Sequence, residues 1–481
     1  MNDSAKPHGE PPLVVDLDGS ILRSDMLLET LAAALRHAPL AALAVPVWAL
    51  SGRANLKEQL ARRASVAPEW LPYREDVLEW LREERQRGRR IVLATASNER
   101  VAQSIAAHLG LFDEVIASTP DRNLKGDAKR QVLVGRYGER GFDYAGDSHA
   151  DLPVWRSSRR AILLVDDRGL KASIGRDADV DVRSDVKVSR WSALLGALRV
   201  HQWAKNILVF VPLFTAHRAT EPALQLLAGA AFVSLSLAAS AIYLVNDLAD
   251  LESDRRNPRK RRRAFASGDL GLAWGLALAP LLLAGSVAIA VHASASLAMA
   301  IGAYVVLSIA YTMALKRVAI LDVIVLAGLY TLRIIVGGVA IDVEVSQWLL
   351  AFSMFIFLSL AFAKRHVEIA WLGRESGIDA ATPGRGYRAR DLEAISMFGV
   401  ASGFLSLVIL ALYVSSRDVL RLYTQPVLLW LLLPVMLYWI LRIWLLAWRQ
   451  ELHDDPIAFA LRDPPSYVAG ALCAAVAFAA T

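Results

Sequence analysis

The sequence predicts a chain of two parts: an N-terminal α/β domain with a parallel sheet and a helical cap, then an all-α polytopic membrane domain of about nine transmembrane helices. Residues 1–190 mix charged residues with short apolar runs, as soluble domains do. From about residue 194 onward, apolar stretches long enough to cross a bilayer follow one another. The chain has 481 residues, 55% of them hydrophobic, and a mean hydropathy of +0.37, which is too apolar for a wholly soluble protein. We place the domains at residues 11–190 and 194–480, with the cap at about residues 24–88.

Composition also excludes several classes of protein. Residues 1–12 contain Asp3, His8 and Glu10 but no apolar stretch, so we expect no signal peptide and a cytosolic N-terminal domain. Cys473 is the one cysteine of the sequence, which excludes an intramolecular disulfide and a cysteine-based zinc cluster. The net charge is +6, but the densest basic cluster directly follows a membrane segment, where cytoplasmic topology explains it. We therefore expect no nucleic-acid partner.

The N-terminal domain contains four short apolar runs with the length of buried strands. These are residues 13–15, 91–93, 142–144 and 161–165. The stretches between them, such as residues 77–87 and 100–109, have helical periodicity, which predicts a parallel sheet with crossover helices. In such sheets, functional sites form at the carboxyl ends of the strands, and polar residues gather at these ends here.

The polar residues at these strand ends fit phosphoryl transfer through an aspartyl-phosphate. Asp16 would attack phosphorus, and Asp18 would protonate the leaving alkoxide and later activate water. Thr95 and a lysine would bind the phosphoryl oxygens and neutralise the charge that grows in the transition state. Asp147 and Asp151 would hold Mg²⁺ together with Asp16.

These residues resemble the motifs of the haloacid dehalogenase (HAD) superfamily. Residues 16–20, with the sequence DLDGS, are similar to its first motif, Thr95 to its second, and residues 146–151, GDSHAD, to its fourth. The resemblance implies a Rossmannoid fold, Mg²⁺ and phosphatase chemistry. For the lysine of the third motif it favours Lys129, although Lys125 is near enough to compete.

The resemblance covers about residues 11–185 and leaves three points open. Ser20 stands where threonine is commoner. The insert between Gly19 and Ile91 resembles a helical cap, and its residues 40–50 are nearly all apolar, so that they either touch lipid or pack inside the cap. An inactive pseudoenzyme with the same fold is an alternative to a phosphatase.

Nine apolar segments are predicted to span the membrane. They lie near residues 196–216, 223–245, 272–292, 296–315, 320–341, 347–363, 394–414, 425–446 and 466–480. With a cytosolic N-terminal domain, the loops that hold most of the Lys and Arg residues are cytosolic, in agreement with the positive-inside rule. We therefore expect a multi-pass protein of the cell (inner) membrane with a cytoplasmic N-terminal domain and an external C-terminus.

Four polar residues lie where the second apolar segment ends and the basic run of residues 255–263 begins. They are Asn246, Asp247, Asp250 and Asp254. At about 3.6 residues per turn, one helical stripe carries Asn246, Asp250 and Asp254, and Asp247 joins it. Mg²⁺ bound by few carboxylates takes its remaining ligands from water and substrate phosphates. The motif therefore predicts Mg²⁺ on Asp247, Asp250 and Asp254, and a phosphorylated substrate at the lipid surface.

This arrangement, followed by Lys260 and Arg263, resembles the first aspartate-rich motif of the UbiA prenyltransferase superfamily. A weaker second match includes Lys316, Asp322 and Arg333, of which Asp322 alone is acidic. The resemblance implies an all-α membrane fold and a Mg²⁺-dependent transferase.

Further segments are similar to the decaprenyl-phosphate phosphoribosyltransferase branch of this superfamily. They are residues 198–206, with Gln202, Trp203, Lys205 and Asn206, residues 238–247, Lys364 with Arg365, and residues 457–463. The resemblance covers about residues 194–480. It implies transfer of 5-phosphoribose from phosphoribosyl diphosphate to a polyprenyl phosphate, or another prenyl lipid, that enters from the bilayer. The candidate substrate-binding residues are Lys205, Asn246, Lys260, Arg263, Lys316, Asp322, Arg333, Lys364 and Arg365.

Arg333 lies eleven residues beyond Asp322, which is about 16 Å along a helix and roughly mid-bilayer. Charge at this depth normally faces an interior cavity, so we expect a lipid phosphate or an internal carboxylate as its partner. In the basic run 255–263, we expect Lys260 and Arg263 to be functional and their neighbours to face water or anionic lipid. Lys316 either anchors the topology or binds substrate.

Together, the two resemblances suggest sequential steps in which the HAD-like domain removes the 5-phosphate of the phosphoribosyl lipid. Two alternatives stay open for the membrane domain. One is transfer of a prenyl group from its diphosphate to an aromatic or lipid acceptor, and the other is a transporter or scaffold whose intramembrane charges line a pathway. The oligomeric state is open, with a homo-oligomer among the alternatives.

Overall fold

The computed structural model describes most of the chain. It describes residues 10–481 except for residues 38–43, 64–65, 175–178, 184–188, 259, 377–381, 383–384, 417–418, 420–421, 453–455 and 461. The chain divides into two compact units. The first comprises Met1–Leu198 and Tyr243–Leu278, and the second comprises Arg199–Ile242 and Ala279–Thr481.

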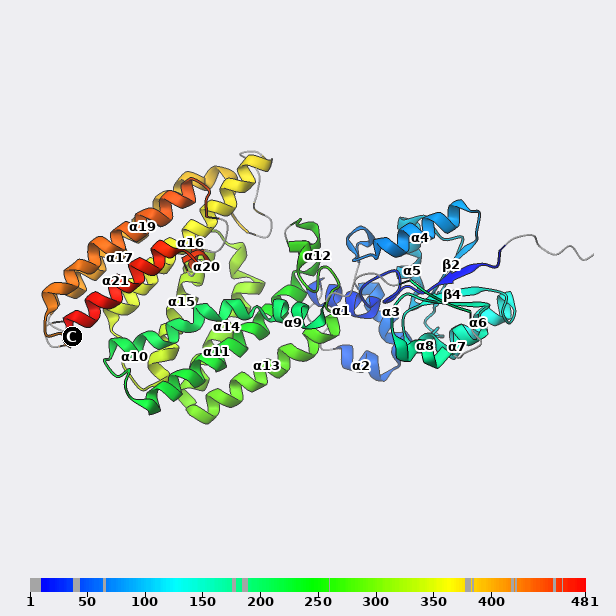
Figure 1. Ribbon diagram of the computed structural model, residues 1–481, viewed down its shortest axis with the longest axis horizontal. Coiled ribbons are helices and arrows are strands. Elements are labelled where there is room, and N and C mark those ends of the chain that lie inside the picture. Colours follow the sequence, from blue (N-terminus) through cyan, green and yellow to red (C-terminus); the bar gives the residue numbers. More distant parts are fainter. Residues whose placement is uncertain are drawn as a thin grey trace, which may run out of the picture. The chain divides into compact units, whose positions relative to one another are not determined.

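The first unit contains a parallel sheet of six strands (Figure 1). The strands are β1 Leu13–Val15, β2 Ile91–Asn98, β3 Glu114–Ser118, β4 Asp143–Gly146, β5 Arg160–Leu163 and β6 Asp179–Val182, in the order β3-β2-β1-β4-β5-β6. The predicted parallel α/β sheet is confirmed, and β3 and β6 add to the four strands that we predicted. In the register, Val14 lies opposite Val92 on one side and Tyr144 on the other. The carboxyl end of β1 is therefore flanked by those of β2 and β4.

Helices connect and cover the strands of this sheet. They are α4 Glu75–Gln86, α5 Glu99–Leu109, α6 Asp127–Tyr137, α7 Leu152–Ser157, α8 Arg168–Ile174 and, after the sheet, α9 Arg190–Leu198. In α4, the one-turn repeat of Val77, Leu78 and Leu81 buries one face against the sheet. Asn98 begins α5 by accepting a hydrogen bond from the backbone N–H of Arg100, and Gly110 ends the helix in a left-handed conformation.

The long connection between β1 and β2 is helical. It contains α1 Met26–His37, α2 Val45–Leu50, α3 Arg53–Arg63 and the short 3₁₀ helix η2 Pro68–Trp70. Leu27, Leu31 and Leu56 pack around the buried Ala34 and Leu60, so α1 and α3 share a small apolar core.

The first unit also includes the segment with the predicted aspartate motif. It consists of the end of α11 Pro222–Ala249, then α12 Leu251–Arg256, the 3₁₀ helix η5 Lys260–Arg262 and the start of α13 Leu272–Ala293. These elements hold the basic run and its neighbouring carboxylates.

The second unit is a bundle of helices (Figure 1). Its remaining elements are η4 Val200–Phe210, α10 Val211–Thr215, α14 Ala295–Met313, η6 Leu315–Arg317, α15 Leu321–Ala340, α16 Gln347–Ser376, η7 Ala389–Asp391, α17 Leu392–Val414, η8 Pro426–Leu431, α19 Leu432–Trp448, α20 Pro456–Ala460 and α21 Pro464–Ala480. A Cβ atom at Gly337 would lie 2.0 Å from the carbonyl oxygen of Val209. Glycine at this position therefore lets η4 pack directly against α15.

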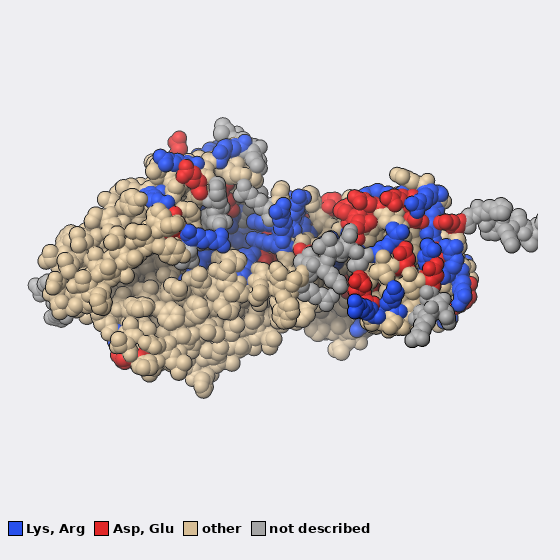
Figure 2. Space-filling view, viewed as in Figure 1, with Lys and Arg blue, Asp and Glu red and all other residues tan. Residues whose placement is uncertain are grey.

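Seven described helices are long and apolar enough to cross a membrane. They are Pro222–Ala249, Leu272–Ala293, Ala295–Met313, Leu321–Ala340, Gln347–Arg374, Ala389–Val414 and Pro426–Trp448. Figure 2 shows a largely uncharged surface over the helical bundle and many charged side chains over the α/β domain. The chain is therefore a multi-pass membrane protein.

The predicted count of nine spans is not confirmed. Residues 196–216 do not form one helix. Arg199 has a left-handed backbone (φ 50°) between α9 and η4, and a separate helix, α10, begins at Val211. The last predicted span, residues 466–480, lies in α21, which has 17 residues and is shorter than the seven helices above. Parts of the predicted motif at residues 457–463, including Leu461, lie outside the described residues.

Candidate functional site

Three carboxylates meet at the carboxyl ends of β1 and β4. Asp16 follows β1, and Asp147 and Asp151 follow β4. Each offers an oxygen within 4.8 Å of the others, and this is the one such group of acidic, His or Cys side chains in the described part of the chain. Carboxylate oxygens at this spacing suit a Mg²⁺ ion, as we predicted from the motifs. The structure therefore brings the three predicted ligands together.

Lys129 lies beside this group. Its Nζ donates hydrogen bonds to Oδ1 of Asp16 (2.7 Å) and to the hydroxyl of Tyr144 (2.8 Å), and it lies 3.6 Å from Oδ1 of Asp151. The Tyr144 hydroxyl in turn donates to Asp151 at 2.7 Å. Lys125 is exposed. Of the two lysines that the motif left open, the geometry places Lys129 at the site.

Asp18 is held by two donors. The backbone N–H of Met26, at the start of α1, donates to its Oδ1 (2.8 Å), and the Ser97 hydroxyl donates to its Oδ2 (2.7 Å). The buried Thr95 lies in β2, two residues before Ser97, and its hydroxyl accepts a hydrogen bond from the backbone N–H of Ser97 at 3.0 Å. Sequence reasoning missed Ser97 and Tyr144, because neither belongs to a motif, although both flank one.

Burial and mutual repulsion shift the proton affinities of these acids. Burial raises the pKa of Asp16 to about 6 although Lys129 lowers it, and burial with the charges of Asp16 and Asp151 raises the pKa of Asp147 to about 8. Burial with the charges of Asp25 and Asp16 raises the pKa of Asp18 to about 7. These groups repel one another, so a divalent cation suits the site. An acid with a pKa near neutrality suits proton transfer.

Close packing at Gly19 shapes the same site. A Cβ atom there would lie 2.1 Å from Oδ2 of Asp147, and the backbone is left-handed (φ 75°). The adjacent Ser20 donates from its hydroxyl to Oδ1 of Asp147 at 3.3 Å. Glycine at position 19 is therefore required for Asp147 to reach the other carboxylates.

Helix α11 ends at Ala249, within the predicted aspartate motif. The helical hydrogen bonds between residues four apart nevertheless continue from α11 into α12. The backbone N–H of Asp250 donates to the carbonyl of Asn246 (2.8 Å), and that of Asp254 donates to the carbonyl of Asp250 (2.9 Å). Nη1 of Arg263 donates to both Asp247 (3.1 Å) and Asp254 (2.6 Å). The guanidinium thus lies between two of the three predicted metal ligands.

One carboxylate oxygen of Asp254, Oδ1, is available to bind a metal ion. It is buried, and no described residue lies within hydrogen-bond distance of its Oδ1. Burial raises the pKa of Asp254 although Arg263 lowers it. A buried carboxylate oxygen without a hydrogen bond is the kind of donor that a metal ion satisfies. Asp254 therefore fits a metal ligand, although among the described residues Asp247, Asp250 and Asp254 do not form a close group like that of Asp16, Asp147 and Asp151.

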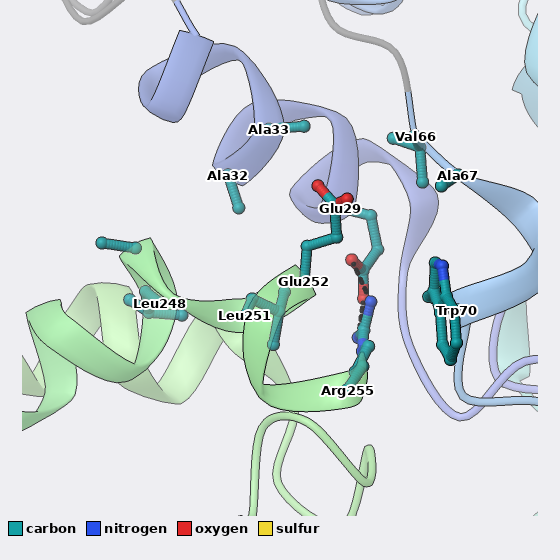
Figure 3. A pocket seen from close by; sticks show the side chains of 11 residues that line it. Glu29, Ala32, Ala33, Val66, Ala67, Trp70, Leu248, Leu251, Glu252 and Arg255 are labelled. Carbon is teal, nitrogen blue, oxygen red and sulfur yellow. Dashed lines mark hydrogen bonds and ion pairs between the residues drawn. The ribbon is translucent and has the colours of Figure 1, made fainter. Parts of the chain in front are cut away.

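Arg255 corrects one expectation about the basic run. Instead of facing water or lipid, it is buried and donates to both carboxylate oxygens of Glu29 in α1, at 2.6 and 3.0 Å. Figure 3 shows this pair in a pocket that Trp70 and Leu251 also line. The neighbouring Arg256 lies with its guanidinium 5.7 Å from the Trp70 ring. Lys260 is exposed, as a free substrate-binding side chain would be.

Neutral groups within the second unit hold Arg333. Its Nε donates to the side-chain oxygen of Asn206 (3.0 Å), and its other nitrogens donate to the Leu329 carbonyl and the Tyr304 hydroxyl. Its guanidinium also faces the rings of Tyr304 and Tyr330. These hydrogen-bond partners of Arg333 in the described part of the chain are neutral acceptors, so of the two expected partners, a lipid phosphate and an internal carboxylate, the lipid phosphate stays as the prediction. The ring of Tyr330 lies 5.7 Å from Nζ of the buried Lys205.

Asp322 and Arg365 bind each other. Nε of Arg365 donates to Oδ2 of Asp322 at 2.6 Å, and both side chains are buried. The Tyr387 hydroxyl also donates to Asp322, and Glu368 accepts from Arg365. Asp322 and Arg365, both predicted to bind substrate, thus belong to one buried network of charged and polar side chains. Lys364 precedes Arg365 in the sequence. Lys316, in η6, and Lys364, in α16, are both half-buried.

Comparison with known proteins assigns both parts of the chain to families. Residues 206–462 match the UbiA prenyltransferase family, and residues 13–156 match the haloacid dehalogenase-like hydrolases. The uncharacterized protein y4nM of Sinorhizobium fredii is 42% identical over 469 residues, which is 96% of this chain and 90% of that protein.

Two further relatives match shorter parts. Nodulation protein NoeC of Azorhizobium caulinodans is 35% identical over 272 residues, 56% of this chain and 88% of that protein. The decaprenyl-phosphate phosphoribosyltransferase of Mycolicibacterium smegmatis is 38% identical over 182 residues, 37% of this chain and 57% of that protein.

Proposed function

The chain belongs to the UbiA prenyltransferase family and carries a HAD-like domain, and on this basis we propose that its membrane domain transfers 5-phosphoribose from phosphoribosyl diphosphate to a polyprenyl phosphate. Relatives named decaprenyl-phosphate phosphoribosyltransferase support this choice of substrates. We further propose that the HAD-like domain removes the 5-phosphate of the product. Domain limits at residues 11–190 and 194–480 belong to the same proposal.

The contact between Arg333 and Asn206 carries the proposal for the acceptor. Asn206 belongs to the segment that resembles the phosphoribosyl-transferring branch, and it is buried against the one charged side chain of α15 that lies deep in that helix. Lys205 adds a second buried cation on the same segment. Ionisable side chains inside a membrane domain commonly mark the path of a charged substrate, and the phosphate of a polyprenyl lipid is an anion that arrives through the bilayer.

For the donor, the proposal rests on the carboxylates and cations of α11, α12 and the loop after them. Asp247, Asp250 and Asp254 would hold Mg²⁺, which when bound neutralises charge on the departing diphosphate. Arg263 and the exposed Lys260 would share that charge. The acceptor phosphate oxygen attacks the anomeric carbon of the ribose as the diphosphate leaves, so no protein nucleophile is required.

The HAD-like domain would act by two successive displacements at phosphorus. Asp16 attacks the 5-phosphate, and Asp18 gives its proton to the departing ribose oxygen. Asp18 then takes a proton from water, which releases phosphate from Asp16. Lys129 and Thr95 bind phosphoryl oxygens, and Asp16, Asp147 and Asp151 would hold Mg²⁺. The pKa of Asp18, about 7, supports both of its roles.

We propose that the protein lies in the cell (inner) membrane with its HAD-like domain in the cytoplasm and its C-terminus outside. This orientation requires the chain to cross the bilayer also at residues 200–215 and in α21, besides the seven long helices. The Lys and Arg residues of residues 255–263 and 316–317 then lie on the cytoplasmic side, where positive charge is retained. Phosphoribosyl diphosphate, a soluble donor, would then reach the aspartate motif from the cytoplasm.

One experiment tests both activities. Detergent-purified protein is incubated with polyprenyl phosphate, Mg²⁺ and radiolabelled phosphoribosyl diphosphate, beside Asp16→Asn, Asp254→Asn and the control Glu252→Gln on the same helix. We expect labelled lipid without its 5-phosphate in wild type and the control, labelled lipid with its 5-phosphate in Asp16→Asn, and none in Asp254→Asn.

Absence of labelled lipid in the wild type would overturn the phosphoribosyl proposal. The assay is then repeated with a labelled prenyl diphosphate and an aromatic acceptor, since prenyl transfer is the second candidate that the family description favours. Labelled lipid that keeps its 5-phosphate in the wild type would support the transferase and overturn the phosphatase step.

A further inference from the structure

The α/β domain carries one short helix that has no polar side chain. Helix α2, Val45–Leu50, has the sequence VPVWAL, and none of its residues is buried. Leu50 is 90% exposed and Val47 is 62% exposed. The next most exposed large apolar residue among the described residues 10–183 is Trp70, at 37%. Within residues 10–183, the exposed large apolar side chains are therefore concentrated at the tip of α2.

Helices at a protein surface normally carry polar residues on the face that points to water. All six residues of α2 are apolar or aromatic. Its inner face is already used, because Trp48 packs with the apolar core shared by α1 and α3. Val47 and Leu50 thus form an outer face that water solvates poorly. Contact with an apolar environment would remove Val47 and Leu50 from water and is therefore favourable.

Basic side chains surround this apolar tip. Arg53 follows Leu50 by three residues and is exposed, and Arg63 of α3 lies with its guanidinium 4.6 Å from the Trp48 ring. Arg62 is also exposed, while the one acidic residue of α3, Glu58, is buried and accepts a hydrogen bond from Arg62. The rim of the tip is therefore positive.

We propose that α2 docks the α/β domain on the membrane, with Val47 and Leu50 entering the boundary between headgroups and acyl chains, and Arg53 and Arg63 binding anionic lipid headgroups. An apolar tip with a basic rim is the composition of segments that lie in a membrane interface. Because the chain itself crosses the bilayer, this domain is permanently near lipid, and a small apolar contact suffices to hold it there. The docking does not depend on the proposed phosphoribosyl chemistry.

Docking through α2 has a consequence for the phosphate site. Helix α3 follows α2 directly, and its Lys57 donates from Nζ to the Ala96 carbonyl (2.5 Å) and to the side-chain oxygen of Asn123 (3.0 Å). Ala96 immediately follows Thr95, the predicted phosphate-binding residue of β2. A lipid-docked α2 would thus keep the phosphate site at the membrane surface, where a phosphate ester attached to a lipid would be found.

Depth-dependent fluorescence quenching tests the docking in the full-length protein. Cys473 is the one cysteine of the sequence, so Cys473→Ala provides a thiol-free background. Leu50→Cys carries an environment-sensitive fluorophore in that background, and Glu83→Cys on the exposed face of α4 is the matched control, since the Glu83 side chain is 62% exposed. Both proteins are reconstituted in vesicles of phosphatidylcholine with phosphatidylglycerol, with and without nitroxide lipids.

We expect nitroxides near the headgroup boundary to quench the Leu50 probe several-fold more than the Glu83 probe. Omitting phosphatidylglycerol should weaken that difference. Equal quenching of the two probes would overturn the proposal. So would a Leu50 probe that is shielded from aqueous iodide yet insensitive to nitroxide lipids, because this would mean that another protein surface covers α2. Loss of quenching in Arg53→Glu with Arg63→Glu would identify the basic rim as the lipid contact.

Discussion

Nζ of Lys129 donates a 2.7 Å hydrogen bond to Oδ1 of Asp16 across 113 residues of sequence. The charges of Asp16 and Asp151 raise the pKa of Lys129 although burial opposes this. The lysine therefore stays positively charged next to the proposed nucleophile. It is placed to stabilise negative charge on a transferring phosphoryl group.

Replacing Lys129 should disable the phosphatase step specifically. We expect Lys129→Ala to lower phosphate release by about 10²–10³-fold, the usual loss when one electrostatic donor is removed. The control is Lys125→Ala, which removes the exposed competing lysine and should have little effect. Phosphate release from the phosphoribosyl lipid is measured for both variants. A larger loss of phosphate release in Lys125→Ala than in Lys129→Ala would mean that Lys125 is the lysine of the third motif.

Asp143 should make the stability of the α/β domain depend on pH. It is fully buried and accepts hydrogen bonds from Arg89 and Arg159, and although burial raises its pKa, these two arginines hold the pKa of Asp143 below its ordinary value. A depressed acid pKa stabilises the fold above the unfolded pKa of about 3.9, and this stabilisation is lost as pH falls through the folded pKa. Asp143→Asn should lower the free energy of unfolding by about 3 kcal/mol at neutral pH.

Urea unfolding of the α/β domain, followed by pulse proteolysis in detergent, measures this difference. The gap between wild type and Asp143→Asn should shrink at low pH. The control is Asp181→Asn, which removes a half-exposed pair with Arg183 and should change stability by no more than about 0.5 kcal/mol. A gap that stays constant from neutral to acidic pH would contradict the assignment.

Breaking the pair of Glu29 and Arg255 should destabilise the first unit. Each single change, Glu29→Ala or Arg255→Ala, leaves a buried charge without its partner, which typically costs about 3–5 kcal/mol. The double variant should cost less than the sum of the two. Proteolysis within residues 248–256 measures the opening. The exposed pair Glu252 and Arg256 on the same helix is the control, and similar losses from both pairs would refute a special role for Glu29.

Arg333→Gln should weaken acceptor binding more than donor binding. A hydrogen bond to a charged group contributes about 1.5–3 kcal/mol, so the KM for polyprenyl phosphate should rise at least about tenfold. The KM for phosphoribosyl diphosphate should change little. Arg317→Gln, which removes an exposed arginine after the neighbouring helix, is the control. A fall in kcat with both KM values unchanged would contradict a role of Arg333 in acceptor binding.

Several features of the sites were predictable, because they depend on short sequence spacings or on the general geometry of parallel sheets. Asp16 and Asp18 share one turn after β1, and parallel strands place their carboxyl ends on one edge, so Asp147 and Asp151 had to come near them. The helical repeat of Asn246, Asp250 and Asp254 also persists. Strands β3 and β6 were not predicted, since the apolar run of β3 is only three residues long and a charged residue interrupts that of β6.

Contacts between distant residues could not be read from spacing. Nothing in the sequence near Arg255 indicates Glu29, and nothing near Arg333 indicates that its partner is the amide of Asn206 instead of a carboxylate. The end of α9 at Arg199 was not predicted, because an apolar stretch indicates hydrophobicity but not where the backbone leaves the helical conformation.

The sequence by itself determined the two-part organisation, the parallel sheet, the apolar helices and the identity of the acidic motifs, because periodicity and chain order act over a few residues. Tertiary structure decided which charges meet. It chose Lys129 over Lys125, placed Arg263 between Asp247 and Asp254, and left the outer face of α2 exposed. These outcomes depend on burial and on partners brought from far along the chain, and the free energy of a buried charge is set by those partners.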